Sequence, residues 1–103
     1  MACLFSKEGQ LTYRVINLDS ERDTEEYEDL IDLGCSVVVQ NLDVKDSHQR
    51  KGAGSALLKQ LRADFPQAVI GLFTNGDLGL RTFYEKNGFT FPQGDWVAVQ
   101  EPI

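Results

Sequence analysis

The sequence predicts a single α/β domain over residues 1–103, and three observations carry that prediction. First, 103 residues with 42% hydrophobic content suffice for one core and leave no room for a second. Second, the runs at 35–44 and 68–74 are rich in β-branched and apolar residues, as buried strands are. Third, each run is followed by a segment with helical spacing of its apolar residues, and such strand–helix alternation is typical of α/β folds.

The first part of the chain is expected to form one strand and one short helix. "LTYRVINL", residues 11–18, has the β-branched and aromatic content of a strand. The acidic stretch at 20–33 is compatible with a short helix that Gly34 would end. The residues expected to face inward from this helix are Tyr27, Leu30 and Ile31.

A buried strand followed by a helix is expected in the middle of the chain. "CSVVVQNLDV", residues 35–44, is bounded by a glycine and by the polar turn "KDSHQRK", which indicates a largely buried strand. A helix should then cover about 52–64 and stop at Pro66, since proline cannot continue a helix. The residues expected on its inner face are Ala53, Ala56, Leu57 and Leu61.

The last third repeats this alternation. "AVIGLFT", residues 68–74, predicts a second buried strand, with the turn "NGD" after it. A helix should cover about 78–86, because Asn87-Gly88 supplies the left-handed residue that helix C-termini favour. The tail contains two short strand candidates around a Pro-Gln-Gly turn. Where a helix connects successive strands, we expect those strands to pair in parallel.

Charge is distributed unevenly along this acidic chain. The net charge is −6, and the segment 19–32 holds eight acidic residues against one base. The basic residues expected to cluster around the glycines of the middle turn are Lys45, Arg50, Lys51, Lys59 and Arg62. The acidic segment is either a solvated surface or a surface that attracts a cationic substrate or basic protein. Nucleic-acid binding is disfavoured, because the composition lacks an extended basic face.

The remaining composition excludes several classes of site. No apolar run approaches the length of a membrane span, and the N-terminus lacks the pattern of a secretory signal, so we expect a soluble, cytoplasmic protein without membrane partners. Cys3 and Cys35 lack C-x-x-C spacing and are interpreted as reduced thiols; a nucleophilic role for Cys35 is less favoured than a buried structural one. The single histidine, His48, has no clustered partner, so no metal site is expected.

The stretch "HQRKGAGSALLKQL", residues 48–61, has the features of an anion site. A strand here leads into a glycine-containing turn that opens a helix, whose first N–H groups lack carbonyl partners and lie at the positive end of the helix dipole. Glycines at 52 and 54 let an anion approach the backbone, and Arg50 and Lys51 add charge at the rim. The spacing matches neither a nucleotide P-loop nor a dinucleotide fingerprint, so it does not name the ligand.

Two motifs resemble those of a known protein family. "QRKGAG", residues 49–54, resembles the Q/R-x-x-G-x-G/A signature of the GNAT superfamily of N-acetyltransferases, and "FYEKNGF", residues 83–89, resembles its F/L-Y-E-x-x-G-F element. The resemblance covers about residues 35–100. It implies a small, N-terminally reduced member with a mixed, partly splayed sheet flanked by helices and with acetyl-CoA as co-substrate.

The resemblance also implies roles for individual residues. Strand residues Leu42, Asp43 and Val44 would meet the pantetheine arm through their backbone, and Asn75, near Asp77, would contact the cofactor. Tyr84 would be the general acid that protonates the departing thiolate. The residues whose backbone amides would bind the pyrophosphate of coenzyme A are Gln49, Arg50, Lys51, Gly52, Ala53, Gly54 and Ser55.

The acceptor side is the least determined from the sequence. The strand 35–44 lacks the glutamate that many members use as a base, so no base is assigned, and His48 is interpreted as a turn residue. A primary amine is the expected acceptor, either a small amine, a polyamine, or a protein lysine or N-terminus. A homodimer that completes the cleft or covers a sheet edge is compatible with the short N-terminal part.

Two non-enzymatic interpretations remain open at this stage. The missing base and the short N-terminal part are also compatible with a catalytically reduced GNAT fold that binds acyl-CoA, or no ligand, and acts as an acidic interaction or inhibitory protein. A nucleic-acid mimic is a weaker alternative, because the acidic run is confined to one local segment.

Overall fold

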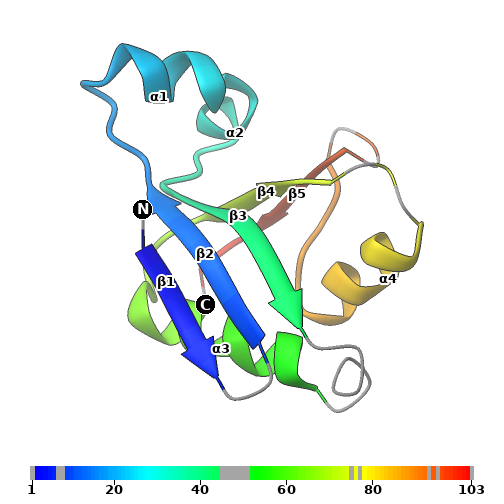
Figure 1. Cartoon of the computed structure of the whole chain (residues 1–103). Helices are drawn as coiled ribbons and strands as arrows, with labels where there is room; N and C mark the ends of the chain where they lie inside the picture. The colour runs from blue at the N-terminus through cyan, green and yellow to red at the C-terminus, as the bar shows by residue number, and fades with distance from the viewer. Residues whose placement is uncertain are drawn as a thin grey trace.

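Five strands form one open, mixed sheet with helices on both faces (Figure 1). The computed structural model describes residues 2–6, 9–44, 52–74, 76, 78–92, 94 and 96–102. The strands lie side by side in the order of the chain. The elements are β1 (Ala2–Ser6), β2 (Gly9–Val15), α1 (Glu21–Glu26), α2 (Glu28–Asp32), β3 (Val37–Val44), α3 (Ala53–Asp64), β4 (Ile70–Phe73), α4 (Leu78–Lys86) and β5 (Val97–Gln100).

The α/β class and both long helices agree with the sequence prediction, whereas the pairing directions agree only in part. β3 and β4, which are joined through α3, pair in parallel as expected. β2 with β3, and β4 with β5, pair antiparallel although helices connect them, so that expectation is wrong for these two pairs. At β5 the chain has already turned back after α4, since Thr90 forms an antiparallel bridge with Val99.

The strand β1 was not predicted. It forms an antiparallel hairpin arm along β2, from Ala2 opposite Tyr13 to Ser6 opposite Gly9. Its side chains alternate in the way an edge strand requires, with Leu4 packed against the core and Phe5 68% exposed. Five residues with only one inward apolar contact are too weak a pattern to distinguish from a loop in the sequence alone.

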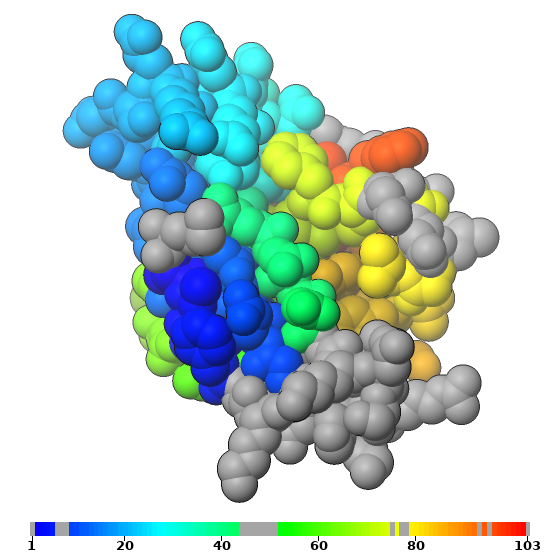
Figure 2. Space-filling model, viewed as in Figure 1, coloured from blue at the N-terminus to red at the C-terminus, as the bar shows by residue number. Residues whose placement is uncertain are grey.

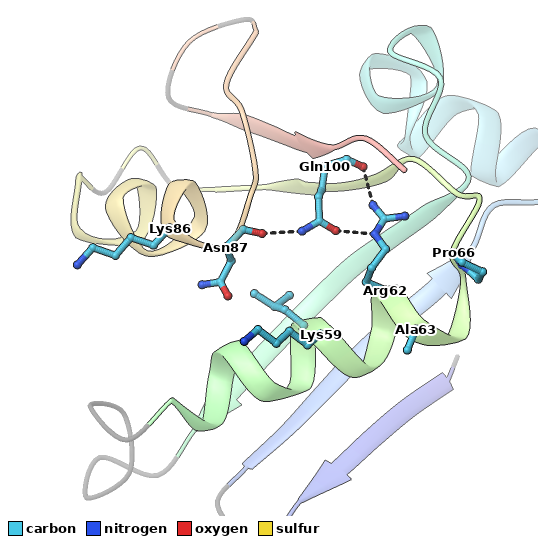
Figure 3. A pocket seen from close by; sticks show the side chains of 8 residues that line it. Lys59, Arg62, Ala63, Pro66, Lys86, Asn87 and Gln100 are labelled. Carbon is cyan, nitrogen blue, oxygen red and sulfur yellow. Dashed lines mark hydrogen bonds between the residues drawn. The ribbon is translucent and has the colours of Figure 1, made fainter. Parts of the chain in front are cut away.

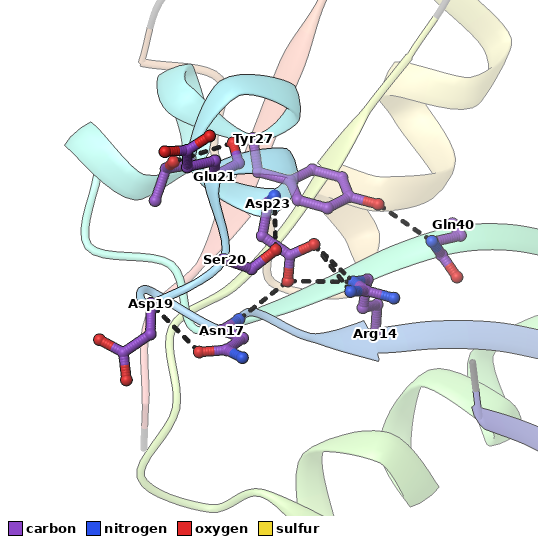
Figure 4. Close-up of polar contacts among 9 residues, drawn as sticks. Arg14, Asn17, Asp19, Ser20, Glu21, Asp23, Tyr27 and Gln40 are labelled. Carbon is purple, nitrogen blue, oxygen red and sulfur yellow. Dashed lines mark hydrogen bonds and ion pairs between the residues drawn. The ribbon is translucent and has the colours of Figure 1, made fainter.

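The acidic segment forms two short helices instead of the single helix expected over 20–33. Helix α1 is capped by Ser20, whose hydroxyl accepts from the backbone N–H of Asp23, and it ends at Tyr27, where α2 begins. Asp23 is fully buried and accepts from Arg14 Nε at 2.9 Å and from the Asn17 backbone N–H at 2.9 Å (Figure 4). These hydrogen bonds hold the pKa of the Asp23 carboxyl below its ordinary value. The segment is therefore attached to β2 by a charged pair.

Apolar side chains form two clusters, one on each face of the sheet. Helices α3 and α4 pack on one face, and α2 packs on the other. Tyr27 and Leu30 are buried as predicted, Ile31 is partly buried, and Gly34 ends α2 with a φ of +86°. On α3 the buried face includes Leu57, Leu58 and Leu61, while Ala56, which was expected there, is exposed.

Large parts of the front of β1, β2 and β3 are uncovered by helices in the view of Figure 2. Within the described residues, no helix has both the length and the apolar character that crossing a membrane would require. That same part of the chain contains no group of three or more potential metal ligands.

Helix α2 approaches β4 so closely that only glycine fits between them. A Cβ added to Gly71 would lie 2.6 Å from Cys35 Sγ and 2.9 Å from Leu30 Cδ2. Both neighbours are buried, so neither has free space to move into. The contact sets how near the acidic helices sit to the sheet.

We therefore predict that Gly71→Ala lowers the free energy of unfolding by about 1–3 kcal/mol through overpacking. Urea denaturation measures the change. In a Cys35→Ala background the cost of Gly71→Ala should shrink, because the nearest clashing atom is gone. An unchanged denaturation midpoint for Gly71→Ala would show that α2 does not pack on β4 in this way.

Candidate active site

The strands β3 and β4 separate in the middle of the sheet. They pair over only three positions, ending with Val39 opposite Leu72, while β3 continues to Val44 alongside β2 (Figure 1). β4 itself ends at Phe73. The backbone of β3 therefore extends past its parallel neighbour β4 after Val39. Beyond this residue, the N–H and C=O groups of β3 that face β4 are not paired in the β3–β4 ladder. This opening between β3 and β4 is called the fork.

A β-bulge accompanies the fork. Thr12 lies opposite Asn41 and the next residue of β2, Tyr13, lies opposite Val39, so Gln40 is the extra residue of β3. Because of the insertion, Val39 and Leu42 both contact the cluster beneath α3 although they are three positions apart. Gln40 is exposed. The bulge thus changes the direction of β3 and the alternation of its side chains at the point where it leaves β4.

Helix α3 begins at the end of the fork with a glycine and without a side-chain cap. Gly52 is the N-cap and has φ +80° and ψ 12°, a left-handed conformation that disfavours other residues. A Cβ at this position would meet nothing within 4 Å, so the space beside the backbone is open. The first-turn amides of Ala53, Gly54 and Ser55 have no intrahelical partners and lie at the positive end of the dipole. A helix start of this kind suits an anion, and the anion site that the motif indicates stays a prediction.

Gly54 has a second role that the sequence did not indicate. It is buried, and a Cβ there would lie 3.0 Å from Phe83 Cζ and 3.6 Å from Leu42 Cδ2. This glycine therefore lets α4 and β3 approach the first turn of α3. The helix start, the free part of β3 and the helix that carries Tyr84 converge at this point.

Tyr84 is 8% exposed and packs edge-on against two phenylalanines of the same sequence motif. Its ring centroid lies 5.1 Å from that of Phe83 and 5.4 Å from that of Phe89. Burial raises the pKa of the phenol above its ordinary value of 10.0. The phenol is therefore protonated at neutral pH, the state that a proton donor needs, and the raised pKa also makes it a weaker acid than an exposed tyrosine.

A hollow of about 210 Å³ opens on the opposite face of the fork, beside the acidic helices. Glu26 lines it from the end of α1 and Tyr27 from the junction of α1 and α2, and Gln40 and Phe73 line it from β3 and β4. Gln40 Nε2 donates to the Tyr27 hydroxyl at 3.0 Å, which ties the bulge to the helix (Figure 4). Glu26 is the only carboxylate in this lining among the described residues.

Sequence reasoning missed Glu26, which is one of eight acidic residues in a single run. No local pattern separates it from its neighbours, because its distinction is its position over the bulge of β3. The break between α1 and α2 at Tyr27 gives it this position, and the sequence was interpreted as one continuous helix.

The structure contradicts the sequence prediction at Arg62. It describes only some of the other predicted site residues. Arg62 is 7% exposed and lies in the last turn of α3, so it does not join a positive cluster around the glycines. Val44 pairs opposite Gly9 at the end of β3. The predicted residues that lie outside the described part of the chain are Lys45, His48, Gln49, Arg50, Lys51, Asn75 and Asp77.

Cys35 is buried between α2 and β4, and burial raises the pKa of its thiol to about 11. It is therefore a neutral thiol at pH 7, which agrees with the structural role favoured from the sequence. Cys3 is exposed and unpaired, and its Sγ lies 3.8 Å from the hydroxyl of Thr12.

Comparison with known proteins supplies the family. A search of curated proteins found no match to the chain. A family comparison matched residues 10–91 to the family described as "Acetyltransferase (GNAT) domain". The matched stretch runs from β2 past the helix that carries Tyr84 and includes the fork, and it is well over half of the chain. The chain therefore belongs to the GNAT acetyltransferase family.

Proposed function

We propose that this protein is an N-acetyltransferase that moves the acetyl group of acetyl-CoA to a primary amine by direct attack. Family membership supports acyltransferase-type activity in general. The observation that carries the finer proposal is the convergence of three elements at the fork: the free part of β3, the glycine-opened start of α3 and the helix that carries Tyr84. All three lie in one domain that we propose spans residues 1–103.

The residues at the fork fit coenzyme A through backbone groups. An anionic pyrophosphate suits the open, uncapped start of α3, and the free part of β3 offers main-chain donors and acceptors to an amide-bearing arm. Acetyl-CoA supplies an activated thioester. The residues proposed to hold it are Leu42, Val44, Gln49, Arg50, Lys51, Gly52, Ala53, Gly54, Ser55 and Asn75.

Tyr84 is the proposed general acid. When an amine displaces a thiolate, the departing sulfur must take a proton. The raised pKa of Tyr84 keeps a proton on its phenol oxygen throughout the neutral range. Its edge-on contacts with Phe83 and Phe89 restrict the orientation of the ring, which limits where the phenol oxygen can lie.

Glu26 is the proposed contact for the acceptor amine. An incoming primary amine is an ammonium ion in solution and must lose a proton before it attacks. The hollow that Glu26 lines lies against Gln40, where β3 leaves β4, so a carboxylate here can bind the cation and take its proton. The neighbouring acidic residues of α1 and α2 would draw cationic amines, polyamines or basic proteins toward this face.

Calorimetry with acetyl-CoA tests the cofactor proposal, and two glycines make a matched pair. Gly52→Ala should weaken binding roughly 10-fold, because a strained helix start presents its amides less well. Gly34→Ala is the control: Gly34 also has a left-handed φ, of +86°, and open space around its Cβ position, but it lies beside α2. No binding to the unmodified chain at millimolar acetyl-CoA would overturn the enzyme proposal. Binding without transfer to any amine of a broad panel would instead favour an interaction protein that holds acyl-CoA.

Tyr84→Phe should lower kcat by about 100-fold and leave the KM for acetyl-CoA nearly unchanged, because only the proton donor is lost. Steady-state kinetics measures both constants. Tyr13→Phe is the control, since Tyr13 packs edge-on against Phe65 and does not line the fork. If Tyr84→Phe kept full turnover across the neutral pH range, the general acid would have to be another group.

Glu26→Gln should lower kcat/KM for a cationic amine by roughly 100-fold while calorimetry finds acetyl-CoA binding intact. Glu25→Gln removes the same charge from the adjacent residue, which is exposed and does not line the hollow, and should have a small effect. Equal effects of the two variants would mean that the segment acts only through its total charge. The specific role of Glu26 would then be refuted.

A further inference from the structure

A second and larger hollow lies away from the fork, between the later part of α3, the end of α4 and β5 (Figure 3). Its volume is about 420 Å³. Its apolar lining comes from Leu58, Ala63 and Pro66. The apolar lining residues on α3, Leu58 and Ala63, are centred about 10 Å along the helix axis from its glycine-opened start, given a rise of about 1.5 Å per residue. The hollow is therefore separate from the proposed cofactor site, and no part of the proposed acetyl transfer uses it.

Arg62 places a positive charge in the wall of this hollow. Nε donates to Gln100 Oε1 at 2.9 Å, Nη1 donates to the carbonyls of Phe65 and Ala68, and Nη2 donates to those of Gln100 and Glu101. All five N–H groups are thus bound to neutral oxygens. These hydrogen bonds join α3 to the chain before β4 and to the end of β5. Among the described residues no carboxylate forms an ion pair with it. Its charge is buried and fixed, and the carboxylate of Glu101 acts on it through space without forming an ion pair.

Two lysines add to this charge. Lys59 lies on the α3 side of the hollow and Lys86 extends outward at its α4 rim (Figure 3). Both are exposed, and neither forms an ion pair with another described residue. No carboxylate lines the hollow in that part of the chain. The lining of this hollow thus brings together three cations and no carboxylate among the described residues, in a protein of net charge −6.

The remaining polar groups of the lining are occupied, which narrows the chemistry of a ligand. Gln100 Nε2 donates to the Asn87 carbonyl at 2.6 Å, and Asn87 Nδ2 donates to the Phe83 carbonyl at 2.9 Å. Every N–H group of the Arg62 guanidinium is already hydrogen-bonded. The hollow therefore lacks the bidentate pair of N–H donors with which a free arginine binds phosphate. The groups that can bind a ligand's charge are two compact ammonium ions on flexible stems. These suit one carboxylate at the mouth and an apolar body inside.

We propose that this hollow binds a small amphipathic carboxylate, with its alkyl or aryl body against Leu58, Ala63 and Pro66 and its carboxylate between Lys59 and Lys86. A volume of about 420 Å³ is within the range of small-molecule sites, about 300–1,000 Å³. In this proposal the side chain of Lys86, which extends outward in Figure 3, rotates toward the mouth to meet the carboxylate. The fixed charge of Arg62 favours the anion without donating a hydrogen bond to it.

Titration of the full chain with octanoate, followed by amide NMR, tests this proposal. Saturable shift changes should concentrate at residues 58–66, 86–87 and 100, and octanamide, a neutral ligand of the same length, should bind at least about 10-fold more weakly. The double variant Lys59→Gln/Lys86→Gln should lose at least about 10-fold in octanoate affinity. Both lysines are exposed, so the variant should retain the fold, which its circular dichroism would verify.

Arg22→Gln removes an exposed cation from α1 and is the matched control, with octanoate affinity expected to stay unchanged. Three results would overturn the proposal: shift changes that never saturate, shift changes centred on the start of α3, or equal affinities for octanoate and octanamide. None of these measurements uses acetyl transfer. Their failure would therefore leave the proposed acetyltransferase function unaffected.

Discussion

The early end of the β3–β4 ladder is the constraint on which the rest of the structure depends. β3 follows β2 along its whole length, and the extra residue Gln40 turns it away from β4 after three paired positions. Backbone N–H and C=O groups are too polar to be left without partners in a dry site. Among the described residues no strand pairs with this edge of β3 beyond Val39, so its main-chain groups are available to water or to a ligand with amide groups. The binding that we propose at the fork therefore rests on main-chain geometry more than on any single side chain.

The acidic segment depends on this sheet for its structure. α1 and α2 have six and five residues, and helices this short are not stable alone in water. They hold their place because Asp23 is buried against Arg14 and Asn17, and because Leu30 packs next to Gly71. The segment that the sequence left open as a solvated surface is therefore a fixed acidic surface at one face of the fork. Of its described carboxylates, only that of Glu26 lines the hollow beside Gln40.

Sequence signals such as helix caps, helix breakers and apolar spacing predicted the features that depend on neighbouring residues. They predicted few of the contacts between distant segments. The bounds of α3 and α4 followed from Pro66, Gly88 and the helical spacing, since caps and breakers act within a few residues. The glycine-containing motif at 49–54 indicated the start of α3 for the same reason. The antiparallel entry of β5, the bulge at Gln40 and the position of Glu26 depend on contacts between distant segments. No periodicity or spacing in one sequence encodes such contacts.

Arg62 shows why counting charges along a helix can mislead. By sequence it belongs with the basic residues near the glycines, yet it lies in the last turn of α3 and binds the carbonyls of Phe65 and Ala68. A cation near the negative end of a helix is favourable, and here it also closes the chain onto β5. The two ends of α3 thus both carry positive charge, one as the partial charge of its first-turn amides and one as a buried guanidinium. Because a buried charge in a fixed position is screened less than a mobile surface lysine, the end with Arg62 keeps its potential at ionic strengths that weaken surface pairs.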